Sequence, residues 1–147
     1  MTKIQFLKDI HKSKHAEMQA FCDACMAHEE FMNTHQMCWF ISERFYQRFK
    51  NKLFVVDETK KDGIRGAAML HFEKGKMICI SHLFVKQKFR NHGIATKILK
   101  EAIKFAKKNG RKIYLNVNVL NIKAYDLYRK LGFIPDCGQN IRMTFEK

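Results

Sequence analysis

The chain has 147 residues, of which 46% are hydrophobic and 12% aromatic, a composition that excludes a disordered protein. This length predicts a single domain over residues 1–147 with one sizeable core. No apolar run approaches the roughly 18 residues of a membrane span, and the N-terminal residues lack a signal-peptide core, so we expect a cytoplasmic protein without a membrane partner. A net charge of +14 favours a polyanionic partner such as nucleic acid or a phosphate-rich cofactor.

Strand and helix patterns alternate along the first part of the chain. Residues 2–7 alternate weakly, as in a strand, and two later segments, 11–22 and 38–50, carry apolar residues at helical spacing. Short glycine-containing turns then separate three predicted strands, which we expect to be antiparallel neighbours: residues 53–57, 64–72 and 76–85.

Cysteine and histidine gather between the two predicted helices, at Cys22, Cys25, His28, His35 and Cys38. These residue types are the usual ligands of zinc. A lone C-x-x-C pair lacks the second regular pair of a zinc ribbon, so we expect no metal. The odd total of five cysteines indicates reduced thiols.

A strongly periodic helix is predicted over residues 93–109, with its apolar residues on one face and an Asn-Gly stop at its end. A strand at 112–119 follows, and then a short helix that begins after Asn121 and ends at Gly132. Two last strands are predicted at residues 133–137 and 141–145. This order of elements predicts an α/β fold with a mixed sheet.

The stretch FRNHGIA, residues 89–95, joins the third of the central strands to the long helix. These elements and the next strand form a βαβ unit, in which ligands collect at the carboxyl ends of the strands. The N–H groups of a helix N-terminus favour an anion, Gly93 permits its close approach, and Lys86, Lys88 and Arg90 add positive charge. Neither a Walker A nor a Rossmann glycine pattern is present, so on this segment alone an ordinary helix start is an equal alternative.

Two motifs resemble those of the GNAT superfamily of N-acetyltransferases. The segment Arg90-Asn91-His92-Gly93-Ile94-Ala95 fits the signature R/Q-x-x-G-x-G/A, and NIKAYDLYRKLGF, residues 121–133, resembles the second hallmark, N-x-x-A-x-x-L-Y-x-K-x-G-F. The spacing of the motifs and the order of the elements are similar too. The resemblance implies an acyl-CoA N-acyltransferase fold of about seven mostly antiparallel strands, with a central parallel pair that splays apart and about four flanking helices.

The resemblance implies acetyl-CoA as the acyl donor, bound where the two parallel strands separate. Backbone groups of Leu83, Phe84 and Val85 would pair with the pantetheine arm, and an N–H there would polarise the acetyl carbonyl as an oxyanion hole. Asn121 matches a family residue beside the pantetheine arm and equally suits a helix cap. The pyrophosphate would lie at the helix N-terminus, against a run of residues: Lys88, Arg90, Asn91, His92, Gly93, Ile94, Ala95 and Thr96.

Candidate catalytic groups come from three segments. By its position in the second motif, Tyr128 matches the family's general acid, and a phenol suits this role since it stays protonated at neutral pH. Tyr128 also lies on an apolar helical stripe, which is typical of a core residue. His82 is a candidate general base, but alternation turns it away from Ser81 unless a bulge re-aims it, and a structural histidine is the competing interpretation. Glu29 and Glu30 lie where the family builds its acceptor site, as candidates for substrate binding or as the base.

The implied reaction is direct attack of a primary amine on acetyl-CoA within a ternary complex. The acceptor stays open between a small molecule, a peptide or protein N-terminus or lysine, and an aminoacyl-tRNA, and its site can extend across a homodimer interface. The alternative function is a basic module that binds RNA or ribonucleoprotein on the same fold without catalysis, although no RNA-recognition signature is present.

Overall fold

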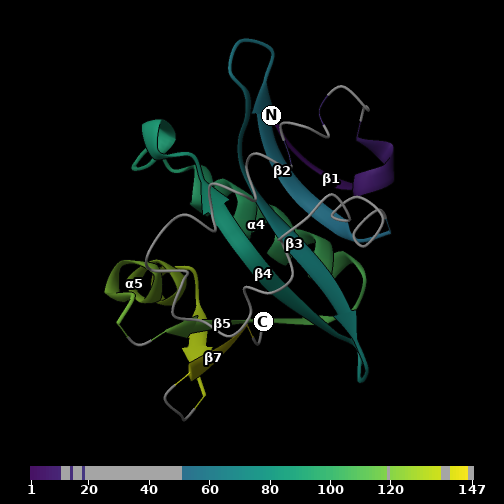
Figure 1. The fold of residues 1–147 in the computed structure, drawn as a ribbon. Coiled ribbons are helices and arrows are strands. Elements are labelled where there is room, and N and C mark those ends of the chain that lie inside the picture. The colour runs from purple at the N-terminus through teal and green to yellow at the C-terminus, as the bar shows by residue number, and fades with distance from the viewer. Residues whose placement is uncertain (11–13, 15–17, 19–50, 119, 137–139, 146–147) are drawn as a thin grey trace.

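The computed structural model describes residues 1–10, 14, 18, 51–118, 120–136 and 140–145 (Figure 1). The predicted helices at 11–22 and 38–50 fall almost wholly outside this part of the chain. Glu29, Glu30 and the cysteine and histidine cluster of residues 22–38 also lie outside the described residues. What the sequence indicates for them remains a prediction.

In the described part of the chain, seven strands form one mixed sheet in the order β1-β2-β3-β4-β5-β7-β6. Every neighbouring pair is antiparallel except β4 and β5, which are parallel. This arrangement confirms the predicted fold class, a mostly antiparallel sheet with one central parallel pair. The bounds of the strands are β1 (Thr2–Phe6), β2 (Leu53–Thr59), β3 (Gly63–Glu73), β4 (Met77–Val85), β5 (Lys112–Asn118), β6 (Phe133–Pro135) and β7 (Asn140–Phe145).

Two α-helices accompany the sheet in the described residues: α4 (Ile94–Lys108) and α5 (Ile122–Lys130). Two short 3-10 turns, η1 (Leu7–Asp9) and η4 (Gln87–Phe89), lie in the connections. α4 is the predicted crossover between the parallel strands and packs against β1 to β5, whereas α5 packs against β5 and β6 (Figure 1). No helix in this part of the chain has the length and apolar character needed to cross a membrane.

α4 forms because its apolar residues recur at helical spacing and share one face. That face is buried and consists of Ile94, Ile98, Leu99, Ala102, Ile103 and Ala106. Each large apolar side chain that it buries contributes about 1.5–3 kcal/mol relative to exposure. The solvent face carries five exposed lysines: Lys97, Lys100, Lys104, Lys107 and Lys108. α4 thus covers one face of the sheet and leaves a row of positive charge outside.

The two faces of β4 differ in chemistry. Ile78 and Ile80 belong to the apolar core beneath α4. Since side chains alternate along a strand, Cys79 and Ser81 point to the opposite face, as does His71, the cross-strand partner of Cys79 on β3. The face away from α4 is therefore where polar chemistry collects.

A buried carboxylate ties the first three strands together. Asp57 is 1% exposed, and its carboxylate accepts hydrogen bonds from Arg65 Nε at 2.8 Å and from Thr2 Oγ1 at 2.8 Å. Such a buried charge is tolerated only with close partners, and Arg65 Nη2 lies 2.6 Å from the same carboxylate. The Arg65 guanidinium also lies 6.0 Å from the Phe89 ring centroid. The backbone carbonyl of Arg65 accepts a hydrogen bond from the Lys86 N–H. This network connects the sheet to the turn that follows β4.

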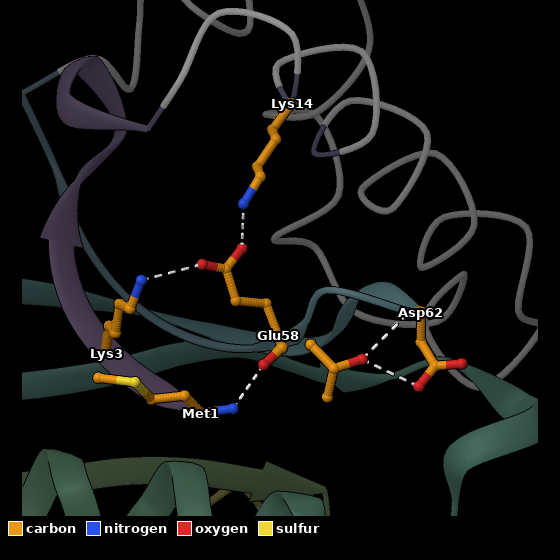
Figure 2. A network of polar contacts seen from close by, with 6 residues as sticks. Met1, Lys3, Lys14, Glu58 and Asp62 are labelled. Atoms are coloured by element: carbon orange, nitrogen blue, oxygen red, sulfur yellow. Dashed lines mark hydrogen bonds and ion pairs between the residues drawn. The ribbon is translucent and has the colours of Figure 1, made fainter.

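Glu58 fixes the N-terminal segment to β2 (Figure 2). Its carboxylate forms ion pairs with Lys3 Nζ at 3.2 Å and with Lys14 Nζ, and its backbone carbonyl accepts a hydrogen bond from the terminal amine of Met1. The hydrogen bond from Lys14, supported by that from Lys3, lowers the pKa of Glu58 although partial burial opposes the shift. The pairs therefore hold residues far apart in sequence against the edge of the sheet.

Candidate active site

The parallel strands β4 and β5 separate before they end. Their pairing runs from Met77 with Lys112 to Ile80 with Leu115, while β4 continues to Val85 and β5 to Asn118. Over these last residues, all within the described part of the chain, the backbone of β4 is not paired with β5. An extended ligand can pair with such a strand as a further strand would. This separation is the predicted splay, and it lies at the carboxyl ends of both strands.

A β-bulge in β4 changes the direction of His82. Ala67 pairs with Phe84 and Met69 with Ser81, so two residues of β4 lie opposite one residue of β3. His82 takes a φ of 52°, a left-handed conformation that histidine adopts more readily than most residues. Alternation alone turns His82 away from Ser81, but the bulge brings its Nδ1 to 3.0 Å from Ser81 Oγ. The sequence allowed for a bulge that re-aims His82, and the structure contains that bulge.

A second histidine, which the sequence analysis did not single out, completes this cluster. His71 Nε2 lies 2.6 Å from Ser81 Oγ, and the centroids of the two imidazoles are 6.5 Å apart. Burial, with a smaller contribution from His71, lowers the pKa of His82 to about 4, so its ring is neutral at neutral pH. Burial and then Lys52 lower the pKa of His71, and Glu73 partly offsets them. Only the register between β3 and β4 reveals this proximity.

The turn after β4 presents the N-terminus of α4 at the splay. The first helical hydrogen bond runs from the Lys97 N–H to the Gly93 carbonyl, so the N–H groups of Ile94, Ala95 and Thr96 precede the helical pattern. Gly93 has a φ of 73°, and a Cβ added there would meet no atom within 4 Å. The turn thus needs glycine for its backbone conformation, and the space beside that backbone is open. These are the features of an anion site at a helix N-terminus.

The preceding residues shape the same turn. Asn91 is also left-handed, with a φ of 64°, and His92 Nδ1 donates to the Arg90 carbonyl at 2.7 Å. Arg90 Nε donates to the Val85 carbonyl at 3.1 Å, and its guanidinium lies 5.6 Å from the Phe84 ring centroid. Arg90 therefore fastens the turn to the end of β4 while it adds positive charge there.

Leu83, Phe84 and Val85 form the end of β4 where it leaves β5. Phe84 is buried, and Leu83 and Val85 are half-buried. Lys88, in η4, is exposed, with its Nζ 4.7 Å from the Phe89 ring centroid. The predicted cofactor segments are thus adjacent in space, because one end of β4 leads directly into the turn.

α5 carries Tyr128 and begins beside the end of β5. Tyr128 is 8% exposed and makes an edge-to-face contact with Phe133, with ring centroids 6.1 Å apart. Burial raises its pKa to about 12, so the phenol keeps its proton at neutral pH. Asn121 Oδ1 accepts the Ala124 N–H at 3.2 Å, which is the geometry of a helix cap. Tyr128 is packed as a core residue and keeps its proton at neutral pH, while Asn121 caps the helix with its oxygen.

No group of three or more histidine, cysteine, aspartate or glutamate side chains in the described residues is arranged to hold a metal ion. The cluster of Cys22, Cys25 and His28 lies outside those residues. The turn, β4 and α5 contribute backbone N–H donors, a neutral imidazole and a protonated phenol, respectively. Such a set suits acyl transfer, in which an oxyanion is stabilised and protons are exchanged.

Comparison with known sequences agrees with this arrangement. The sequence profile of the acetyltransferase (GNAT) family matches residues 18–133. An uncharacterized N-acetyltransferase of Methanocaldococcus jannaschii is 42% identical over 64 residues, which are 43% of this chain and 28% of that protein. The aligned part therefore spans less than a third of the length of this curated relative.

Solved structures share the fold over nearly the whole chain. A GNAT-family acetyltransferase of Staphylococcus aureus Mu50 superposes with a TM-score of 0.74 at 19% identity and covers 98% of both chains. The PaiA N-acetyltransferase of Thermoplasma acidophilum, solved in complex with coenzyme A, has a TM-score of 0.70 at 18% identity and covers 100% of this chain and 99% of its own. At these identities the likeness establishes the fold.

Proposed function

Because the chain belongs to the acetyltransferase (GNAT) family, we propose that it transfers an acetyl group from acetyl-CoA to a primary amine by direct attack in a ternary complex. The observation that carries this proposal is the splay of β4 and β5 after Ile80 and Leu115, with the N-terminus of α4 at its open end. An extended arm can pair with β4 beyond its last pairing with β5 while a diphosphate lies on the helix N-terminus.

The residues at the splay fit acetyl-CoA, which supplies a thioester as the acyl donor. The N–H groups of the turn from Arg90 to Thr96 would hold the pyrophosphate, and the exposed Lys88 adds a cation beside them. Leu83, Phe84 and Val85 would pair with the pantetheine arm. Asn121 can add a donor from its amide nitrogen, since its oxygen already caps α5. The coenzyme A in the Thermoplasma structure supports this donor for the shared fold.

The proposed chemistry uses one backbone donor and two side chains. An N–H near Val85 stabilises the negative charge that develops on the acetyl oxygen. The amine nitrogen bonds to the acetyl carbon, the carbon–sulfur bond breaks, and Tyr128 protonates the departing sulfur. His82 accepts the proton that the amine loses. The raised pKa of Tyr128 and the lowered pKa of His82 leave each group in the protonation state that its role requires at neutral pH.

The exposed lysine row of α4 favours an acceptor on an acidic carrier, such as aminoacyl-tRNA or a ribonucleoprotein. The same row supports the alternative, an RNA-binding module without catalysis. Glu29 and Glu30 remain proposed acceptor-site residues. Three further predictions also stand: a homodimer, a cytoplasmic location and a single domain over residues 1–147.

Binding and turnover test the proposal separately. Acetyl-CoA at 100 times its Kd should stabilise the protein by about 2.7 kcal/mol and raise its Tm. A thiol-release screen with acetyl-CoA against amino acids, polyamines, aminoglycosides, peptides and aminoacyl-tRNA should identify the acceptor. No Tm shift at millimolar acetyl-CoA would reject the enzyme, and steeply salt-dependent RNA binding in its place would support the module.

A further inference from the structure

Three side chains on neighbouring strands form a continuous polar chain. Ser81 Oγ lies 2.6 Å from His71 Nε2 on β3 and 3.0 Å from His82 Nδ1 on β4. The proposed function uses His82 as the base but gives no role to Ser81 or His71. Their arrangement depends on the bulge, because only the bulge turns His82 toward Ser81.

The number of hydrogens on Ser81 couples the two imidazoles. A hydroxyl has one hydrogen, so between two neutral rings it donates to one and accepts from the other. In one arrangement His82 Nδ1–H donates to Ser81, Ser81 donates to His71 Nε2, and His82 Nε2 carries no hydrogen. In the reverse arrangement His82 Nε2 is protonated and cannot accept a proton. Ser81 and His71 together therefore decide whether His82 can act as a base.

The electrostatic surroundings favour charge on His71 over charge on His82. Burial disfavours an imidazolium at either ring, and it acts more strongly at His82. Glu73, on the same strand as His71, favours a positive charge there, while Lys52 opposes it. From β4 and β5, Cys79 faces His71 across the strand pair, and Tyr114 pairs with Cys79 and donates to Glu73 at 2.7 Å. Arg142 of β7 stacks over Tyr114, with its guanidinium 4.5 Å from the ring centroid.

We propose that His71 is a positioning residue which, through Ser81 Oγ, holds His82 as the Nδ1–H tautomer and receives the proton that His82 removes from the amine. The inference rests on the proposed function. His82 Nε2 takes the amine proton, directly or through one water, as its Nδ1 hydrogen passes to Ser81 Oγ. The Ser81 hydrogen passes to His71 Nε2, and His71 releases its Nδ1 proton to solvent. One proton enters and one leaves, so no charge stays at His82.

Nitrogen-15 NMR of labelled histidines in the full chain tests the tautomer without any substrate. His92, whose Nδ1 faces the Arg90 carbonyl, is an internal reference, because a carbonyl can only accept a hydrogen. We expect the Nδ1–H form for His82 at neutral pH and its loss in Ser81→Ala and His71→Phe. His71→Gln should keep it, since an amide oxygen can accept from Ser81. An Nε2–H form of His82 in the wild type, or an unchanged tautomer in Ser81→Ala, would overturn the inference.

Kinetics test the transfer of the proton. With the amine found in the thiol-release screen, His71→Gln should lower kcat roughly tenfold, leave KM for acetyl-CoA unchanged and alter the acid limb of the pH profile. Unchanged kcat and pH profile in this variant would reject the relay. Calorimetry with acetyl-CoA separates the two possible failures: no binding rejects the proposed function, whereas binding together with the wrong tautomer rejects only the role of His71.

Discussion

At the scale of single residues, Tyr128 combines a packed position with a transferable proton. Tyr128→Phe keeps the ring that contacts Phe133 and removes only the hydroxyl, so stability should change little. We expect kcat to fall about 100-fold while the Kd for acetyl-CoA stays within a factor of two, because the proposed general acid acts only in the reaction step. Steady-state kinetics and calorimetry measure the two quantities.

Tyr125 is the matched control for Tyr128, since it lies on the same helix and is only half-buried. Tyr125→Phe should leave kcat unchanged. Equal turnover in the wild type and in Tyr128→Phe would remove Tyr128 as the acid and leave it a core residue.

His82 makes stability depend on pH at the same scale. The pKa of His82 is about 4 in the folded state against 6.5 ordinarily, so between pH 6.5 and 4 the unfolded chain binds a proton that the folded chain does not. The free energy of unfolding should therefore fall between pH 6.5 and 4, by up to about 3 kcal/mol, and this contribution should level off below pH 4. The lowered pKa of His71 acts in the same direction.

Denaturant unfolding across this pH range measures the effect. His82→Asn is the informative variant, because asparagine also tolerates the left-handed backbone and does not titrate. Its stability should vary less between pH 6.5 and 4 than that of the wild type. The same slope in both proteins would show that His82 does not carry the effect.

At the scale of elements, a substitution in the turn before α4 can distinguish the cost of backbone strain from the loss of ligand binding. Gly93→Ala places a Cβ at a φ of 73°, which costs about 1–2 kcal/mol, in a space that is open in this structure. We expect the fold to survive and the affinity for acetyl-CoA to fall roughly tenfold, because the new methyl group lies beside the helix N–H donors.

Gly75 is an unusually close control for this element. It has a φ of 72° and equally open surroundings, but it lies in the turn between β3 and β4, at the opposite end of β4 from the splay. Gly75→Ala should cost similar stability and leave acetyl-CoA binding intact. Equal loss of binding in both variants would mean that the effect at Gly93 is general destabilisation.

At the scale of the whole molecule, the net charge of +14 should act on association more than on chemistry. Raising the salt concentration from 50 to 500 mM should increase KM for acetyl-CoA about threefold or more, with kcat nearly constant.

A paired charge reversal on α4, Lys104→Glu with Lys108→Glu, should weaken binding of a polyuridine RNA and reduce the salt dependence of that binding. Insensitivity of both ligands to salt would exclude electrostatic steering.

The sequence predicts well what depends on local pattern. The apolar stripe from Ile94 to Ala106 and the stop after it define α4, and the βαβ order locates the turn at its N-terminus. Cross-strand register is a different matter, because it depends on residues distant in the chain. The contact of His71 with Ser81 and the bulge at His82 follow from the pairing of β3 with β4, and no local pattern indicates them. Arg90 likewise occupies a recognisable motif position, but its hydrogen bond to the Val85 carbonyl is visible only in the structure.

The bulge in β4 also acts as a change of phase in the strand. Before it, even-numbered residues such as Ile80 face α4, whereas after it Phe84 lies opposite Ala67 and the odd-numbered Leu83 and Val85 pack against the core. Deleting His82 would set Leu83 opposite Ala68 and make the pairing regular, with Phe84 still opposite Ala67 and all three residues on their present faces. The extra residue thus gives the strand one more side chain, the imidazole beside Ser81, without changing which residues close the core. A chain shortened by this one residue should keep its sheet and lose only the histidine.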